Sequence, residues 1–251
     1  MQGLLIRSAA VAVSIACLAA APADLFDTPL DKTVVALPPD PLNPHMKPKR
    51  SCTRYPGFLV KEIDLGEIGA EEQTILPLPI GAKTPACEAK LKHEIVIKPA
   101  VWSGTFDGAK GGFLFYDAGD GVNGGMPFAV FAARTGRKLF EDSRAGDRFA
   151  SVALENGALI VRYRRVWLAP CSLYADAARC WKKIIDRTAL APSARPDCSA
   201  KYRDTIKAWP RSVETTVHLP TVIAYEAEAR FDHGRLAVTP RPGKTSCWME
   251  D

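Results

Sequence analysis

The residues best suited to chemistry lie in two short stretches, and the first is a loop rich in oxygen donors and glycine. Asp117, Asp120 and Asn123 stand within seven residues, among the glycines of 119–125. Calcium takes about six to eight oxygen ligands, so backbone carbonyls and water would have to complete such a site. The spacing differs from that of an EF-hand loop, and the same residue types favour turns. We therefore expect no cofactor and a plain turn cluster, with a weak calcium site as the alternative.

The same loop contains the pattern G-x-G-x-x-G between Gly119 and Gly124, directly after the apolar run 113–116. In dinucleotide-binding folds a helix follows this pattern, and the N-terminus of that helix holds the pyrophosphate. Here Pro127 and the strand-like run 128–132 follow instead. The pattern therefore indicates a meander of strands with a polar loop at its edge, not a nucleotide site.

The second stretch combines cationic and aromatic side chains within the strand-like run 158–168. Five of its residues are suited to binding: Arg162, Tyr163, Arg164, Arg165 and Trp167. Arginine and aromatic side chains together favour an acidic glycan or an envelope protein as the partner. The alternative interpretation is an edge strand that its charges protect from aggregation.

Catalytic motifs with recognisable spacing are absent from the sequence. Neither H-E-x-x-H nor G-x-S-x-G occurs, and the four histidines are scattered. We therefore assign no catalytic residue and expect a binding or accessory protein rather than an enzyme. The alternative is a secreted hydrolase that acts on glycans with carboxylates from its loops, because the roughly 5–10 Å between such carboxylates is set by tertiary structure.

Residues 1–23 have the composition of a secretory signal peptide. Arg7 is their only charge, the run Ala9–Ala21 is almost wholly small and apolar, and A-x-A ends at Ala23. An A-x-A pattern marks a cleavage site, and the apolar run is shorter than the roughly 20 residues of a spanning helix. We expect cleavage after Ala23, a periplasmic or secreted location, and no integral membrane segment in the mature protein.

The chain from residue 24 onward contains six cysteines, and an even number in an exported protein predicts three disulfides. These are Cys52, Cys87, Cys171, Cys180, Cys198 and Cys247. Spacing alone leaves many pairings open. Our preferred set joins Cys171 to Cys180, Cys52 to Cys87, and Cys198 to Cys247.

The local pair in this set depends on where a predicted helix begins. Apolar residues recur at helical steps near 173–187. A helix unbroken from Ser172 would hold Cys171 and Cys180 roughly 13 Å apart, at about 1.5 Å per residue. A disulfide requires Cα atoms within about 4.4–6.8 Å. We therefore expect this helix to begin near Ala177 if the two cysteines pair.

The elements that must position these residues are mainly strands. Residues 24–51 carry six prolines and predict an extended tether, and 52–251 form a single domain. Strand patterns occupy 58–65, 93–98, 113–116, 128–132, 138–140, 149–154, 158–168, 212–219, 221–231 and 235–239. Asn156-Gly157 predicts a tight hairpin between two of them. We expect a mostly β fold, an antiparallel β-sandwich or barrel-like twisted sheet, with one docked helix near 173–187.

The charge of the predicted mature chain is mildly basic. Lysine and arginine number 33 against 28 acids, and removal of Arg7 with the signal peptide leaves a net charge of +4. Nucleic-acid-binding domains carry a larger basic excess, concentrated on one face or along one helix. We therefore expect no nucleic-acid partner.

Overall fold

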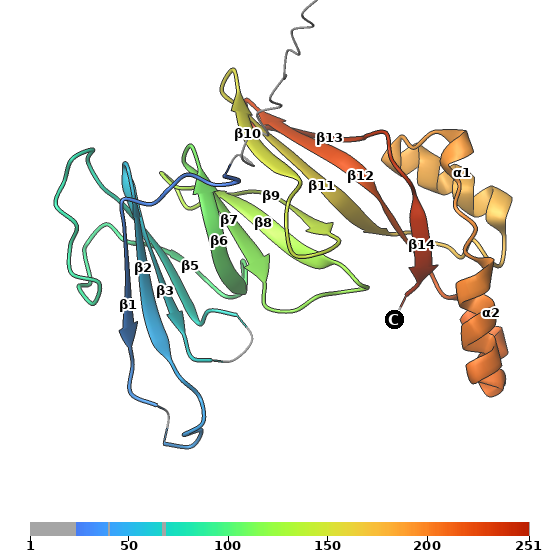
Figure 1. The fold of residues 1–251 in the computed structure, drawn as a ribbon, viewed down its shortest axis with the longest axis horizontal. Helices are drawn as coiled ribbons and strands as arrows, with labels where there is room; N and C mark the ends of the chain where they lie inside the picture. Colours follow the sequence, from blue (N-terminus) through green and yellow to red (C-terminus); the bar gives the residue numbers. More distant parts are fainter. Residues whose placement is uncertain (1–23, 40, 67–68, 251) are drawn as a thin grey trace, which may run out of the picture.

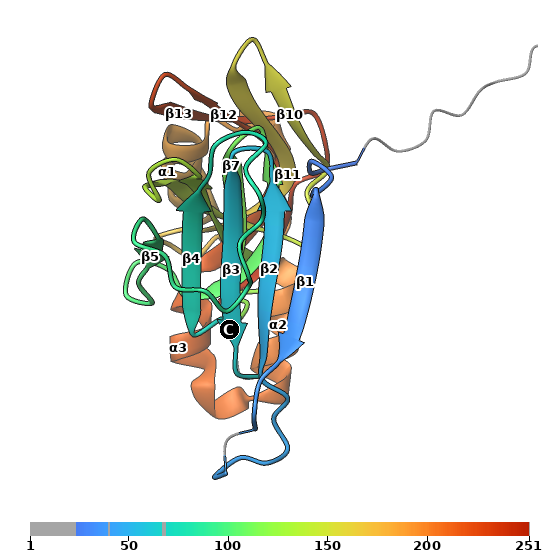
Figure 2. The same ribbon diagram turned by 90° about the vertical axis from the view of Figure 1, so that its left-hand side faces the viewer.

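The computed structural model describes residues 24–39, 41–66 and 69–250, and the predicted signal peptide at 1–23 lies outside them. The described chain forms two antiparallel sheets (Figure 1). The small sheet contains, in spatial order, β1 (Asp31–Ala36), β2 (Lys49–Tyr55), β3 (Phe58–Asp64), β4 (Glu72–Pro77) and β5 (Ile95–Ile97). Figure 2 looks onto this sheet, with β1 at its edge.

The large sheet contains the remaining strands. Their spatial order is β13 (Arg235–Pro240), β12 (Thr221–Asp232), β11 (Ala158–Leu168), β9 (Lys138–Arg144), β8 (Met126–Ala132), β7 (Phe113–Ala118) and β6 (Gly104–Lys110). In addition, β10 (Ser151–Glu155) pairs with β11, and β14 (Ser246–Met249) pairs with β12. The mostly β fold with packed antiparallel sheets and a docked helix is therefore confirmed.

Strands β6–β9 form a central layer, and its middle strands β7 and β8 are buried on both faces. Leu114 and Tyr116 of β7 pack toward the small sheet, whereas Phe115 packs toward β11 and β12. Burial on both faces explains why β7 and β8 read as continuous apolar runs and not as alternating ones. In Figure 1 the layers follow one another from the small sheet through β6–β9 to β11–β12.

The large sheet bends between β9 and β11. These two strands share one register pair, Arg144 with Arg165, whereas β11 and β12 pair over ten residues. The bend brings β11 back over β8, so that the rings of Phe128 and Tyr163 lie 5.2 Å apart, edge to face. The resulting apolar core, between β7–β9 on one side and β11–β12 on the other, is called the large-sheet core below.

The predicted turn between β10 and β11 is present. Asn156 and Gly157 both have positive φ, 51° and 84°, as a two-residue hairpin turn requires. Tyr225–Phe231 alternates as its pattern predicts: the odd-numbered residues are buried, and Glu226, Glu228 and Arg230 face outward, whereas 221–224 are buried on both faces. The local pattern therefore determined both the hairpin and the buried face.

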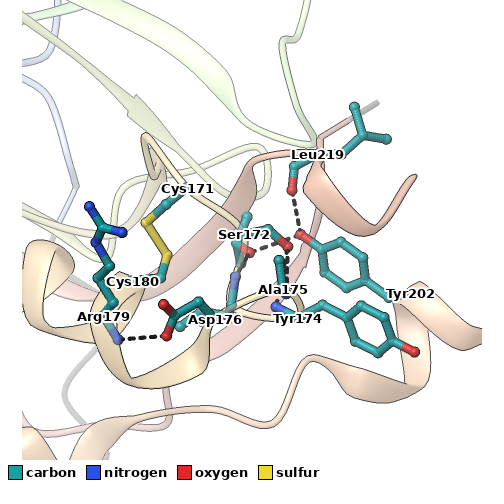
Figure 3. The surroundings of a disulfide bond; sticks show 11 residues. Cys171, Ser172, Tyr174, Ala175, Asp176, Arg179, Cys180, Tyr202 and Leu219 are labelled. Carbon is teal, nitrogen blue, oxygen red and sulfur yellow. Dashed lines mark hydrogen bonds between the residues drawn. A yellow bond between two sulfur atoms is a disulfide. The ribbon is translucent and has the colours of Figure 1, made fainter. Parts of the chain in front are cut away.

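Three helices follow β11: α1 (Ala177–Thr188), α2 (Ser199–Ala208) and α3 (Val213–His218), with the 3-10 turns η1 (Pro192–Ala194) and η2 (Pro210–Ser212). The docked helix α1 begins at Ala177, as pairing of Cys171 with Cys180 requires. Asp176 caps it by accepting the backbone N–H of Arg179 at 3.0 Å (Figure 3). The capping carboxylate satisfies one of the unpaired amides in the first turn.

The predicted strand at 212–219 is wrong, because these residues form α3 after η2. Val213, Thr215 and Val217 have β-branched side chains and favour strands locally. Pro210 instead opens a helical turn, and Thr216 is buried with its hydroxyl 3.2 Å from that of Ser212. Tertiary burial of the helical face overrides the local preference. Helix α2 was not predicted, because its apolar periodicity is weak.

All three preferred disulfides are confirmed: Cys52–Cys87, Cys171–Cys180 and Cys198–Cys247, with Cα atoms 5.6–5.7 Å apart. The first joins β2 to the long connection between β4 and β5. The third joins the start of α2 to β14. Three disulfides are typical of proteins from an oxidising compartment.

The segment 24–51, predicted as a tether, is extended but docked on the domain. Residues 31–36 pair with β2 as edge strand β1 of the small sheet. Leu25 and Phe26 pack against the large-sheet core. The six prolines of the segment all lie outside β1, so none of them removes a donor from its ladder with β2.

Candidate functional site: an acidic cleft beside buried arginines

Strand β6 is irregular where it meets the N-terminal segment. Its pairing with β7 shifts between Phe106 and Gly108, so that Asp107 is the extra residue of a β-bulge. A bulge re-aims a side chain away from the regular ladder. Asp107 lines a cleft of about 760 Å³, whose other walls are residues 24–29 and 147–150. We call it the acidic cleft.

The N-terminal segment 24–29 forms one wall of the acidic cleft because a glycine makes room for it. A Cβ atom on Gly108 would lie 2.3 Å from the ring of Phe26, so only glycine allows this ring to rest on β6. The next residue, Asp27, donates its backbone N–H to the carbonyl of Ala109 at 2.8 Å. The segment is therefore held by packing and by one strand-like hydrogen bond.

The charge of the acidic cleft is predominantly negative. Its charged lining residues are Asp24, Asp27, Asp107, Asp147 and Arg148. The Asp27 carboxylate is engaged, since it accepts the backbone N–H of Gly111 at 2.6 Å. The other three carboxylates make no hydrogen bond or ion pair with any residue that the structure describes. The cleft thus presents three carboxylates that are available to a ligand.

Asp107 is the most perturbed of these carboxylates. It lies at the mouth of the cleft and keeps contact with solvent, but partial burial raises the pKa of Asp107 to about 6. The negative charge of Asp117 adds to this increase, and the guanidinium of Arg144 opposes it. Asp107 therefore changes its charge close to neutral pH.

A buried ion pair lies behind Asp107. The guanidinium of Arg144 is 2.6 Å from the Asp117 carboxylate and also donates to the carbonyl of Gly146. The Arg144 side chain is only 1% exposed, and its cation lies 4.8 Å from the ring centroid of Phe149. Asp117 Oδ1 and Arg144 Nε are buried without hydrogen-bond partners. Despite the ion pair, burial raises the pKa of Asp117.

A second cluster of buried polar side chains lies along the large-sheet core. Asp142 accepts hydrogen bonds from the hydroxyl of Tyr163 at 2.6 Å and from Arg165 Nε at 3.0 Å. Arg165 also donates to the hydroxyl of Tyr225 at 3.0 Å. Burial raises the pKa of Tyr163, and the nearby charge of Asp142 adds to it. Because its tyrosines are neutral and its arginine is paired, we regard this cluster as part of the structural core and not as a binding site.

The five residues of the predicted cationic-aromatic surface do not share one face. Tyr163, Arg165 and Trp167 face the large-sheet core, whereas Arg162 and Arg164 face outward. The two outward arginines lie opposite acids of β12, Glu228 and Glu226, at 2.7 and 2.9 Å. We call this the outer ladder. Binding of an acidic glycan by the outer ladder stays a prediction, and it would have to compete with these ion pairs.

The predicted calcium ligands lie around one tight turn before β8. Val122 and Gly125 exchange backbone hydrogen bonds of 2.8 and 2.9 Å, and Asn123 and Gly124 have positive φ between them. The indole of Trp248 donates to the Asn123 carbonyl at 3.0 Å. In the described part of the chain, no three His, Cys, Asp or Glu side chains converge as metal ligands.

The carboxylates of the predicted calcium site have other partners. Asp117 is paired with Arg144, and Asp120 accepts the backbone N–H of Gly121 at 2.7 Å. These contacts engage one oxygen of each carboxylate, Asp117 Oδ2 and Asp120 Oδ1. Calcium binding by this loop stays a prediction.

A second cleft lies on the other side of Asp27, between the turns of the two sheets. It has a volume of about 670 Å³, and Tyr55, Phe58, Leu78 and Ile80 are among the apolar residues that line it. It lacks a group of unpaired charges. The acidic cleft is therefore the better candidate for specific recognition.

Sequence reasoning missed Asp107, Phe26 and Asp147 because their meeting is tertiary. The one local signal that could have helped was Gly108, since an isolated glycine in a strand marks a bulge or a close backbone approach, but no strand was predicted at 104–110. The chain matches no protein-family model, no curated protein and no solved structure. Among the described residues, no helix combines the length and apolar character needed to cross a membrane.

Proposed function

We propose that this is an exported, non-catalytic binding domain whose acidic cleft takes a small organic cation with an apolar part. One observation carries the proposal: Asp24, Asp107 and Asp147 line a single cleft and have no protein partner there. Clefts lined by charge of one sign attract ligands of the opposite sign. The three disulfides support export, since such bonds persist in oxidising compartments.

The size and walls of the cleft agree with such a ligand. Its volume of about 760 Å³ lies in the range of small-molecule sites, roughly 300–1,000 Å³. Leu25, Phe26 and Pro29 supply apolar surface along one wall. An ammonium group would form charge-assisted hydrogen bonds with Asp107, and these are about twice as strong as neutral ones. The apolar part of the ligand would lie along residues 25–29.

Calorimetric titration with phenethylamine, and with 2-phenylethanol as its uncharged analogue, tests the proposal. We expect the amine to bind and the alcohol to bind at least about tenfold more weakly, because it lacks the charge. Asp107→Asn should weaken amine binding about tenfold, since one charge-assisted hydrogen bond contributes roughly 1.5–3 kcal/mol. Asp204→Asn, an exposed acid on α2, is the matched control and should have no effect. Equal binding of the amine and the alcohol would contradict the proposal.

The pH dependence of amine binding gives a second test. The pKa of Asp107 is about 6, so its carboxylate is charged above that pH and neutral below it. Amine affinity should therefore fall as pH decreases through about 6, and the decrease should be missing in Asp107→Asn. An affinity that stays constant from about pH 8 to about pH 5 would exclude Asp107 as the partner of the amine.

A secreted hydrolase acting on glycans is the second candidate, and the pKa of Asp107 favours it. A carboxyl group with a pKa of about 6 can donate a proton near neutral pH, as the general acid of a glycoside hydrolase does. A binding protein leaves its ligand unchanged, whereas a hydrolase releases new reducing ends. Incubation of the protein with a panel of polysaccharides distinguishes the two, and Asp107→Asn should abolish any release that depends on this cleft.

A further inference from the structure

The tip of the helical region carries an exposed tryptophan. Trp209, between α2 and η2, is 69% exposed, and it is the only Trp, Tyr or Phe of the described residues in the exposed class. Val213, one helical turn further, is 39% exposed. Figure 1 shows α2 extending away from both sheets at this end of the molecule. Tryptophan is enriched at interfaces, because its ring is apolar and its N–H is polar.

Backbone contacts hold Trp209 in place without covering its side chain. Its N–H donates to the Thr205 carbonyl at 2.8 Å and so caps the C-terminus of α2. Its own carbonyl accepts from the hydroxyl of Ser212 at 2.8 Å. Pro210 restricts the backbone at the junction. The backbone of Trp209 is therefore held in a defined position, and its side chain points to solvent.

The base of α2 is fixed to the β domain, which makes the tip a rigid projection. The Cys198–Cys247 disulfide joins its first turn to β14. The buried Tyr202 donates its hydroxyl to the Leu219 carbonyl at 2.8 Å and stacks on Tyr174 with ring centroids 5.0 Å apart (Figure 3). These contacts leave the opposite end of α2, with Trp209, directed to solvent.

The helical region also holds the net positive charge of residues 24–251. Residues 176–218 contain nine lysines and arginines against five acids, whereas the other residues from 24 onward contain 23 of each. Lys207 and Arg211 flank Trp209, are exposed, and form no ion pair with a described residue. The tryptophan therefore stands at the tip of the most basic region of the molecule.

We propose that this tip docks on an anionic lipid surface, with the Trp209 indole among the headgroups and Lys207 and Arg211 against the lipid phosphates. Tryptophan is enriched at membrane interfaces because its ring is apolar and its N–H is polar. Basic residues near an anionic surface strengthen binding by about fivefold each. The charge complementarity favours lipid over an apolar protein groove, which would leave the flanking cations without partners.

Co-sedimentation of the purified protein with lipid vesicles tests this proposal. We expect binding to vesicles of phosphatidylcholine with phosphatidylglycerol, weak binding to phosphatidylcholine alone, and loss of binding at high salt. Trp209→Ala should lower the partition coefficient about tenfold, which corresponds to roughly 55 Å² of apolar surface at about 25 cal/mol per Å². The double variant Lys207→Gln/Arg211→Gln should lower it roughly 25-fold. Ile80→Ala, an 88% exposed apolar residue in the turn after β4, is the control and should bind normally.

Two results would overturn the proposal. One is absence of binding to the anionic vesicles, which would leave the tip as a protein contact. The other is a Trp209→Ala variant that binds as tightly as the original protein. Quenching by brominated lipid gives an independent readout: it should be seen with the original chain and lost in Trp209→Phe. Because the Trp209 side chain is exposed, both variants should keep the melting temperature of the original protein.

Discussion

The two faces of β11 carry arginines in opposite environments. On the inner face Arg165 pairs with Asp142, next to the fully buried Arg144 with Asp117. On the outer face Arg162 and Arg164 pair with acids directly across on β12, and their side chains remain about a third exposed, 37% and 30%. Arg164 and Arg165 are adjacent in the strand, but the sequence does not show which face becomes the core. The alternation of side chains across a strand assigns them to different faces.

The difference shows which charges a ligand can use. The charges of the outer ladder are compensated by partners at short distance, and solvent screens the charge that remains. The inner pairs are enclosed, and beside them the acidic cleft has carboxylates without any partner. A cluster of charge in a sequence therefore indicates a binding site only when the fold leaves its members unpaired. Substitutions on the two faces should differ in size accordingly.

The largest effect is expected on the inner face. Asp117→Ala should destabilise the fold by about 3 kcal/mol, because it leaves the 1% exposed Arg144 without its counter-ion. Urea denaturation measures the change. The double variant Asp117→Ala/Arg144→Met should recover part of the loss, since the buried charge is then removed. A cost below about 1 kcal/mol for Asp117→Ala would place this pair in the same class as exposed pairs.

A smaller effect is expected in the outer ladder. Glu228 accepts from both Arg162 and Arg241 at 2.7 Å, so Glu228→Gln should cost about 0.5–1 kcal/mol. These hydrogen bonds lower the pKa of Glu228 in the folded protein. Its contribution to the free energy of unfolding is therefore present above the pKa of the unfolded state, and it is lost as pH falls through the lower pKa of the folded state. Thermal melts of the original protein and of Glu228→Gln at low and high salt measure this contribution. High salt should reduce the difference between the two melting temperatures. Glu155→Gln, whose carboxylate lies 3.8 Å from Arg162, serves as the control and should be nearly neutral.

The smallest effect is expected at the turn 119–125. Because Asp117 is paired with Arg144, melting curves with millimolar calcium and with chelator should superimpose. If calcium does bind, a free calcium concentration of 100 times the dissociation constant would stabilise the fold by roughly 2.7 kcal/mol. In that case Asp120→Ala should remove the calcium-dependent increase and leave the curve in chelator unchanged. Separation of the two curves would overturn the plain-turn interpretation.

The helical region shows where prediction from local pattern ends. The start of α1 at Ala177 followed from a distance argument, since Cys171 and Cys180 could not pair across an unbroken helix. Helix α3 could not be predicted in this way, because β-branched residues at 213–217 favour a strand until Thr216 is buried as part of a helix. Covalent geometry constrains structure over short spans, whereas propensity alone is weak against tertiary packing.

The sequence by itself determined the features that depend on neighbours along the chain: the hairpin at Asn156-Gly157, the buried face of β12 and the meander around 113–140. Alternation, turn chemistry and chain reach act over a few residues, so they can be read locally. Only the tertiary structure decided that Phe26 docks on Gly108, that Arg144 meets Asp117, and that Asp107 and Asp147 line one cleft. These contacts join segments far apart in the chain, and their burial and charge depend on how the layers pack.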